Sequence, residues 1–412
     1  MPTFPGPDIP GPLAGLRVLD LSRVLAGPCA TQILGDLGAD IIKVERPGAG
    51  DDTRAWGPPY LKDSKGADTS ESAYYMSTNR NKRSVTIDLG NPEGQALVRR
   101  MAGSSDVLVE NYKVGQMAGW GLGYDDLSGD APGLVYCSIS GFGQTGPYAP
   151  RPGYDFLIQG MGGLMSITGE ADGPPVKVGV AVSDIVCGLY SAVAVLGALR
   201  HRDATGRGQH IDLGLLDTQV AWLMNQGLNY LTSGTAQGRL GNAHPNIVPY
   251  EAFEASDGYL ILAVGNDAQF QRFCAFAERP SIAEDPRFAT NRERVRNRES
   301  LTPMIGAVIR EHSVRYWLEG LEAVNVPCGP VNTVDQVFAD PQVTHRNMEV
   351  SMEHPLAGGG ARLIGNPIKF SETPVTYRQP PPLLGEHTDA VLEEVLGLNA
   401  EQRDRLRAAK VI

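Results

Sequence analysis

The 412-residue sequence has few aromatic side chains, a deficit of basic charge and no long hydrophobic run. No stretch approaches the ~18 consecutive apolar residues expected of a membrane-spanning helix, so we expect no membrane association. Acidic residues outnumber basic ones by 47 to 36, for a net charge of -11. Because nucleic-acid binding draws on a basic surface, we expect no nucleic-acid partner either.

Cysteine is sparse, and its spacing shows no pairing pattern. The five cysteines are far apart and form no C-x-x-C motif, so the sequence predicts neither a disulfide framework nor a metal site. This usage favours a reducing, cytoplasmic setting. The segment Met1–Pro12 lacks the basic and apolar regions of a secretory signal.

Several common catalytic motifs are also missing. The sequence contains no G-x-x-x-x-G-K-[ST], H-E-x-x-H or G-x-S-x-G, so ATP-driven, zinc-protease and serine-hydrolase chemistry lose their usual support. A G-x-G-x-x-G motif does occur at 141–146, but Pro147, Pro150 and Pro152 follow it. They favour an extended loop over the helix that a dinucleotide site requires. We therefore expect no permanently bound cofactor.

The first half of the chain alternates short apolar runs with helical patterns. The expected strands are 16–21, 40–44, 84–89, 106–111, 134–140 and 176–182, and the expected helices are 26–37, 92–101 and 185–202. This alternation predicts an α/β fold with a Rossmann-like parallel sheet.

The length suggests about two domains. We expect residues 1–210 to form the N-terminal part of a large domain and 211–245 a linker. Residues 246–330 would then be a smaller α/β domain, and 331–412 a return linker with the C-terminal part of the large domain.

Carboxylates stand at the ends of the expected strands, where ligands bind in open α/β sheets. They are Asp20, Glu45, Glu110 and Asp184. Asp184 also precedes an apolar helix, the position of a helix N-cap. From the residues alone, a capping role and a catalytic role both remain open for Asp184.

Basic residues gather after the second expected strand and around the third. Arg46, Arg80, Lys82 and Arg83 could bind phosphate or carboxylate groups through charge-assisted hydrogen bonds. Solvated surface charges would give the same pattern.

Several long motifs in order resemble the family III CoA-transferases, which include formyl-CoA and carnitine-CoA transferases. They are PLAGLRVLDLSRVLAGP from Pro12, LGADIIKVERPGAGDDTR, NRNKRSVTIDL, VENY, SGFGQTGPY, TGRGQHIDLGLLD and LLGEHTDAVL. The resemblance implies CoA thioesters and free carboxylic acids as substrates, a CoA-binding large domain joined to the small domain by linkers, and an interlocked homodimer.

The resemblance also assigns residues. It implies that Asp184 is the nucleophile and carries an aspartyl-CoA thioester. The CoA contacts that carry over are Arg23, Ala26, Arg46, Ile87, Asn111 and Tyr112. Gly119 departs from the pattern, because relatives often carry an arginine there.

The family also contains α-methylacyl-CoA racemases, which look similar but use a histidine in a G-H-D segment. Here that segment is Gly153-Tyr154-Asp155, so a two-base racemisation lacks one partner. A non-catalytic CoA-binding protein is a second alternative.

The sequence segments are most similar to those of transferases that pass CoA from succinate to dicarboxylates such as glutarate. A distal substrate carboxylate suits a bidentate arginine, and our candidates are Arg80 and Arg294. We expect Tyr154 and Asp155 to contact the substrate or to hold the nucleophile.

Overall fold

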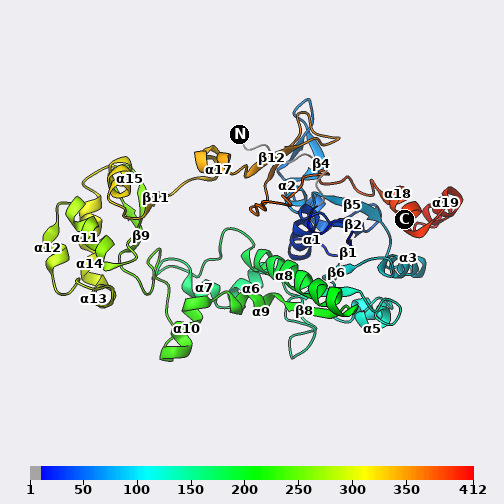
Figure 1. Ribbon diagram of the computed structural model, residues 1–412, viewed down its shortest axis with the longest axis horizontal. Coiled ribbons are helices and arrows are strands. Elements are labelled where there is room, and N and C mark those ends of the chain that lie inside the picture. The colour runs from blue at the N-terminus through cyan, green and yellow to red at the C-terminus, as the bar shows by residue number, and fades with distance from the viewer. Residues whose placement is uncertain (1–10) are drawn as a thin grey trace. The chain divides into compact units, whose positions relative to one another are not determined.

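The computed structural model describes residues 11–412, so our expectation about a secretory signal falls almost wholly outside the described residues. The chain divides into two compact units (Figure 1). Unit 1 comprises the residues up to Gly162 together with Gly179–Trp222 and Pro341–Ile412. Unit 2 comprises Gly163–Val178 and Leu223–Asp340.

Unit 1 is built on a six-stranded parallel sheet with the order β5-β2-β1-β6-β7-β8. Its strands are β1 (Arg17–Asp20), β2 (Asp40–Glu45), β5 (Lys82–Thr86), β6 (Val107–Glu110), β7 (Val135–Ser140) and β8 (His210–Gly214). The order reverses between β1 and β6, so the fold is Rossmann-like, as predicted.

Helices cover both faces of this sheet. Because neighbouring side chains of a strand point to opposite faces, Val18 packs in a core with helices α1 (Ala26–Asp36) and α8 (Val182–Thr205). Leu19 packs in the other core, with α3 (Pro92–Ala102), α18 (Thr388–Leu396) and α19 (Ala400–Ala408). Asn91 caps α3 through the Glu93 amide, as its sequence predicts.

The remaining elements of unit 1 are short. The helices are η1 (Asp52–Ala55), α2 (Ala73–Met76), α4 (Gln116–Gly119), α5 (Tyr124–Leu127), α6 (Asp155–Met161), α9 (Leu215–Ala221) and α17 (Pro341–His345). Two antiparallel pairs complete the unit: β3 (Tyr60–Lys62) with β4 (Asp68–Ser72), and β12 (Glu349–Met352) with β13 (Ala361–Ile364).

Unit 2 has its own core. An antiparallel sheet with the order β11-β10-β9 is made of β9 (Tyr250–Glu254), β10 (Tyr259–Ala263) and β11 (Cys328–Pro330). Its helices are α7 (Leu164–Ile167), α10 (Met224–Ser233), α11 (Asp267–Phe276), α12 (Pro280–Glu284), α13 (Asn291–Arg296), α14 (Arg298–Ile309), α15 (Val314–Ala323) and α16 (Val334–Ala339). Trp317 and Phe270 anchor the core.

Two of our expectations about the chain were wrong. Residues 176–182 form no strand, because β8 occupies the place beside β7, and α8 already begins at Val182. Residues 211–245 are not simply a linker, because β8 belongs to the large sheet and α9 and α10 follow it.

Helix α8 is long and apolar enough to cross a membrane by length and composition alone. However, 61% of its most apolar window is buried inside the protein. Its contacts with α1 and the sheet are those of a core helix.

Candidate functional site

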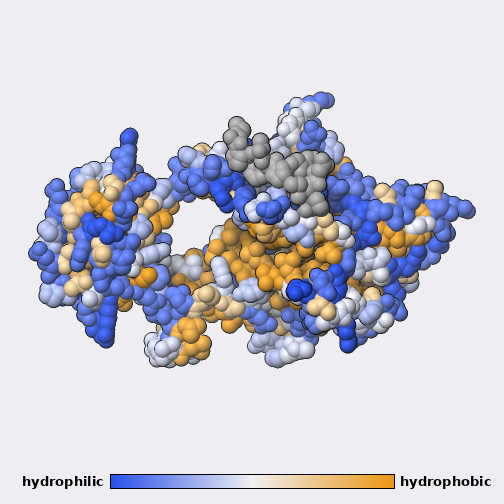
Figure 2. All heavy atoms as spheres, viewed as in Figure 1, coloured by the Kyte–Doolittle hydropathy of each residue, from blue (hydrophilic) through white to orange (hydrophobic). Residues whose placement is uncertain are grey.

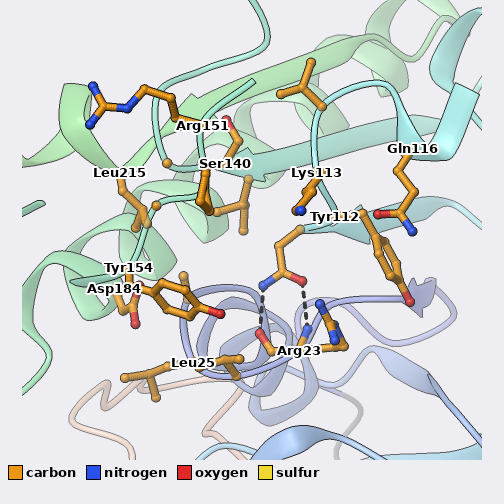
Figure 3. A pocket seen from close by; sticks show the side chains of 18 of the residues that line it. Arg23, Leu25, Tyr112, Lys113, Gln116, Ser140, Arg151, Tyr154, Asp184 and Leu215 are labelled. Atoms are coloured by element: carbon orange, nitrogen blue, oxygen red, sulfur yellow. Dashed lines mark hydrogen bonds between the residues drawn. The ribbon is translucent and has the colours of Figure 1, made fainter. Parts of the chain in front are cut away.

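A pocket, which we call pocket A, lies at the carboxyl ends of β1, β6 and β7 in unit 1 (Figure 3). It spans the point where the strand order reverses, the usual ligand position in such sheets. Its lining includes Arg23, Leu25, Lys113, Tyr154 and Asp184.

A second cavity, pocket B, adjoins pocket A at the ends of β2 and β5. The two pockets share four lining residues: Arg23, Asp52, Tyr112 and Gln116. Together they form a continuous site across five strand ends of one unit.

The structure gathers all six residues expected to contact CoA around these two pockets. Arg23, Ala26, Asn111 and Tyr112 line pocket A, and Arg23, Arg46, Ile87 and Tyr112 line pocket B. Ile87 is only 1% exposed as a whole residue, so it lies behind the surface of pocket B.

Asp184 lies in pocket A, and of the two roles that the sequence left open for it, the N-cap role does not apply. The N-cap of α8 is Ala181, and Asp184 is the third residue of the helix. Within residues 11–412, no group donates a hydrogen bond to its carboxylate. Burial, with the nearby charge of Asp155, raises the pKa of Asp184 to about 7. The carboxylate is therefore half-buried, unpaired and titrates near neutrality.

Asp155 holds the first turn of α8 in place. Its Oδ1 accepts the Ser183 amide at 2.8 Å, and its Oδ2 accepts Gln159 Nε2 at 2.8 Å. Ser183 is further fixed by its hydroxyl, which donates to Gln219 at 2.7 Å. Asp155 thus contacts the helix turn that carries Asp184, whereas Tyr154 lines the pocket itself (Figure 3).

Cations gather around both pockets although the whole chain is acidic. Arg23 pairs with Asp52 at 3.0 Å and stands over the Tyr112 ring. Among the described residues, no carboxylate pairs with Arg46, Lys113 or Arg151. These side chains are available to the anionic groups of a ligand.

Neither Arg80 nor Arg294, our candidates for the distal carboxylate, lines pocket A or pocket B. The buried Arg80 guanidinium binds both carboxylate oxygens of Asp36, at 2.9 and 2.6 Å, and donates to the Ile364 carbonyl at 2.7 Å. Arg294 is buried in unit 2, where it donates to the Val248 carbonyl and pairs with Asp267. Both arginines are engaged by the protein's own acceptors.

Two buried acids near the same edge of the sheet have lysine partners. Asp20 ends β1 and accepts Lys82 at 3.1 Å, while Asp51 accepts Lys43 at 2.9 Å. All four side chains are 0% exposed. The lysines contribute to a lowered pKa of Asp20 and of Asp51, the latter to about 2, despite burial.

Glu110 ends β6 and differs from this pair of acids. It accepts the Tyr112 amide at 2.8 Å, and burial raises the pKa of Glu110 to about 7. The hydrogen bond from the Tyr112 amide to Glu110 therefore fixes the backbone of the Asn111–Tyr112 segment in the pocket wall.

Sequence reasoning missed several polar residues of pocket A, among them Lys113, Gln116, Ser140 and Arg151. Two of these residues could have been identified from their positions: Lys113 follows the VENY motif, and Ser140 ends β7. Arg151 lies in an irregular loop and had no such signal. Within residues 11–412, no cluster of three or more His, Cys, Asp or Glu could hold a metal ion.

Comparison with known proteins identifies the family. The family model described as CoA-transferase family III matches residues 13–388. The chain belongs to CoA-transferase family III. It is therefore an enzyme of the CoA-transferase type that acts on acyl-CoA.

The relatives of this family III chain include named transferases. It is 52% identical over 386 residues to the succinate–glutarate CoA-transferase of Agrobacterium fabrum, covering 93% of this chain and 96% of that one. It is 43% identical over 401 residues to the human succinyl-CoA:glutarate CoA-transferase, covering 97% and 90%.

A solved structure supports the fold of this family III chain. A CAIB/BAIF family protein from Brucella suis superposes with a TM-score of 0.82 at 47% identity, covering 94% of this chain and 100% of that one.

Proposed function

We propose that this protein transfers CoA from succinyl-CoA to a free dicarboxylate such as glutarate, through a thioester on Asp184. The observation that carries the proposal is an unpaired carboxylate in the pocket that also gathers the expected CoA contacts. The names of the relatives supply the donor and the acceptor class.

In the first half-reaction, an Asp184 oxygen attacks the succinyl thioester carbonyl. The C–S bond breaks, which leaves a mixed anhydride and the CoA thiolate. The thiolate then attacks the aspartyl carbonyl, and succinate departs with the anhydride oxygen. Covalent catalysis thus divides one exchange into two easier steps.

In the second half-reaction, the acceptor carboxylate attacks the aspartyl thioester and releases the thiolate. The thiolate then attacks the acceptor's own carbonyl, which forms the new acyl-CoA and restores the Asp184 carboxylate. One thioester replaces another, so no ATP is consumed.

The surroundings of Asp184 suit a nucleophile. No hydrogen bond has to be broken before the carboxylate attacks, because no described residue donates one. Its place in the first turn of α8 also puts negative charge near the positive end of the helix dipole. The raised pKa of Asp184 increases its basicity, at the cost of a smaller ionised fraction below pH 7.

The distal carboxylate of the acceptor requires a cation in pocket A, and we assign it to Lys113 or Arg151. Both line the pocket and have no carboxylate partner among the described residues, unlike Arg80. Lys113→Gln and Arg151→Gln, each assayed with glutarate and with butyrate, separate them. The residue that binds the distal carboxylate is the one whose loss weakens glutarate alone, and equal losses on both acids reject that residue.

We further propose an interlocked homodimer in the cytoplasm. Large apolar side chains are exposed on α6, α8 and α9 of unit 1, and Figure 2 shows apolar atoms gathered over α8. They are Phe156, Leu157, Met161, Leu189, Tyr190, Val193, Leu196 and Val220. Such patches are unusual on monomers, and all five cysteines are free thiols. Sedimentation at the monomer mass would contradict the dimer.

The function is tested by incubating the protein with succinyl-CoA and a panel of dicarboxylates and monocarboxylates, with mass spectrometry of the acyl-CoA products. We expect glutaryl-CoA from the wild type and from Asp203→Ala, a control on the exposed far end of α8. Asp184→Ala should produce none.

Two other outcomes identify the rival functions. Deuterium exchange at the α-carbon of a 2-methylacyl-CoA without CoA exchange would indicate a racemase. CoA binding without either reaction would indicate a non-catalytic CoA-binding protein.

A further inference from the structure

The segment Ser22–Leu25, which we call the strap, joins β1 to α1 and forms one wall of pocket A. Arg23, Val24 and Leu25 all line the pocket. A wall made of irregular backbone keeps its shape only when other groups fix it. The strap's polar groups are fixed almost entirely by side chains.

The centre of the strap has an unfavourable backbone conformation. Val24 has a φ of 68°, in the left-handed region. A β-branched residue is a genuine outlier there, because its Cβ crowds the backbone. Such a residue persists only where its surroundings hold it.

Asn111, at the end of β6, holds the strap from one side. Its Oδ1 accepts the Arg23 amide at 2.9 Å, and its Nδ2 donates to the Arg23 carbonyl at 2.7 Å. Both bonds are drawn as dashed lines at Arg23 in Figure 3. This two-point contact fixes the peptide groups on both sides of Arg23.

The buried ion pairs hold the strap from the other side. Asp51 accepts the Val24 amide at 3.2 Å, and Lys43, which pairs with Asp51, donates to the Ser22 carbonyl at 2.9 Å. The Ser22 amide is bound by Asp20 at 2.9 Å. The side chains of Asp20, Lys43, Asp51 and Asn111 therefore hold three consecutive residues.

We propose that Asn111 is a positioning residue that acts on CoA through the strap, by holding Val24 in its left-handed conformation, and not by contacting CoA itself. The inference rests on the proposed function, because it assigns the strap to the wall against which the acyl-CoA lies. It also changes the role that family resemblance gave to Asn111.

The kinetic test uses the backbone preference of residue 24. In Asn111→Ala the strap loses two hydrogen bonds, so we expect KM for succinyl-CoA to rise ~10-fold with kcat nearly unchanged. Adding Val24→Gly should recover much of the loss, because glycine enters the left-handed region freely. Adding Val24→Ala should recover little, because it shortens the side chain but keeps a Cβ.

The matched pair at residue 24 separates the two roles of Asn111. If Asn111 contacts CoA directly, Asn111→Ala will show the same KM with glycine as with alanine at position 24, and the proposal is overturned. A fall in kcat alone, with KM unchanged, would also overturn it.

A ligand-free measurement distinguishes this inference from the proposed function. Hydrogen exchange of the Val24 amide, which is bonded to Asp51 and not to Asn111, should accelerate in Asn111→Ala. Unchanged exchange would sink the strap mechanism even if the enzyme is active. A wild type that binds no CoA would instead sink the proposed function and leave the exchange result standing.

Discussion

Among the carboxylates near one edge of the large sheet, two kinds can be compared. Asp20 and Asp51 are fully buried and paired with lysines, and each has a lowered pKa. Asp184 is half-buried with no partner among the described residues, and its pKa is raised to about 7. Burial opposes ionisation in both, and only the first kind receives compensating charge.

The paired carboxylates are suited to a structural role, and the unpaired carboxylate of Asp184 is suited to a reactive one. A paired carboxylate is a poor nucleophile because its lone pairs are engaged, but it can fix nearby backbone, as Asp51 does at Val24. A buried carboxylate without a partner lowers the stability of the substrate-free protein. Groups with such perturbed pKa values cluster at active sites.

The largest effect should come from removing the unpaired carboxylate. Asp184→Ala should lower the rate of CoA exchange by on the order of 10⁴-fold or more, because no nucleophile replaces it. Exchange between succinyl-CoA and glutarate measures this. A variant that keeps a tenth of the wild-type rate would remove Asp184 from the mechanism.

Removing the lysine partner of a buried, paired carboxylate should lower the stability of the fold. Lys82→Met leaves Asp20 buried without its hydrogen-bonded cation, which should lower the free energy of unfolding by about 3–5 kcal/mol. The matched control is Lys62→Met, which breaks the exposed pair with Asp68 and should cost under ~1 kcal/mol. Urea unfolding measures both, and equal losses would contradict the comparison.

Burial and, to a lesser extent, the charge of Asp155 should set the pH at which Asp184 becomes active. The exchange rate should rise with pH through about 7, as Asp184 ionises. Asp155→Asn removes the neighbouring negative charge, so the rise should move to lower pH. The groups near Asp184 on other elements are Tyr74 and Cys29, and neither is an ionised cation or anion at that pH. A rise at unchanged pH would show that burial alone sets the pKa.

Asp184 should also make stability depend on pH. Its folded pKa of about 7 lies above its ordinary value of 3.8. As pH rises between these values, the carboxyl ionises in the unfolded chain but stays protonated in the folded one, so stability is lost. Asp184→Asn should therefore gain stability over wild type from pH 4 to 7 and hold the gain above. A thermal-unfolding difference that is flat with pH would contradict the assignment.

The smallest effect is a gain in CoA binding. Gly119 shares a helix face with Gln116 of both pockets, and a side chain at residue 119 would meet no atom within 4 Å. Gly119→Arg should lower KM for acyl-CoA a few-fold by adding a cation where relatives often have arginine. An unchanged KM would place residue 119 outside the CoA contact.

Much of the large domain could be predicted, because its strands are short apolar runs that end in polar residues. The parallel order follows from the alternation of runs and helices. The strand predicted at 176–182 failed because hydrophobicity alone does not tell which run takes the place beside β7. The less apolar His210–Gly214 takes it.

The residues of the site could be predicted from the sequence motifs that contain them. Which charged residues are free to bind a ligand could not be predicted, because ion pairs within the fold determine it. The six expected CoA contacts and Asp184 all reached the pockets. Arg80 and Arg294 line neither pocket. A sequence does not show that Asp36 and Asp267 already hold those guanidinium groups. A charged side chain is available to a ligand only if no other group of the protein already binds it, and the fold determines which groups meet.

The central claim is that Asp184 itself carries CoA during turnover. The most direct test is to mix the enzyme with succinyl-CoA, without an acceptor, and to treat it with hydroxylamine. Peptide mass spectrometry then locates the hydroxamate that a thioester leaves behind. The account predicts hydroxamate on the peptide containing Asp184 and none after Asp184→Ala. Full exchange activity with no hydroxamate, or with hydroxamate on another carboxylate, would contradict it.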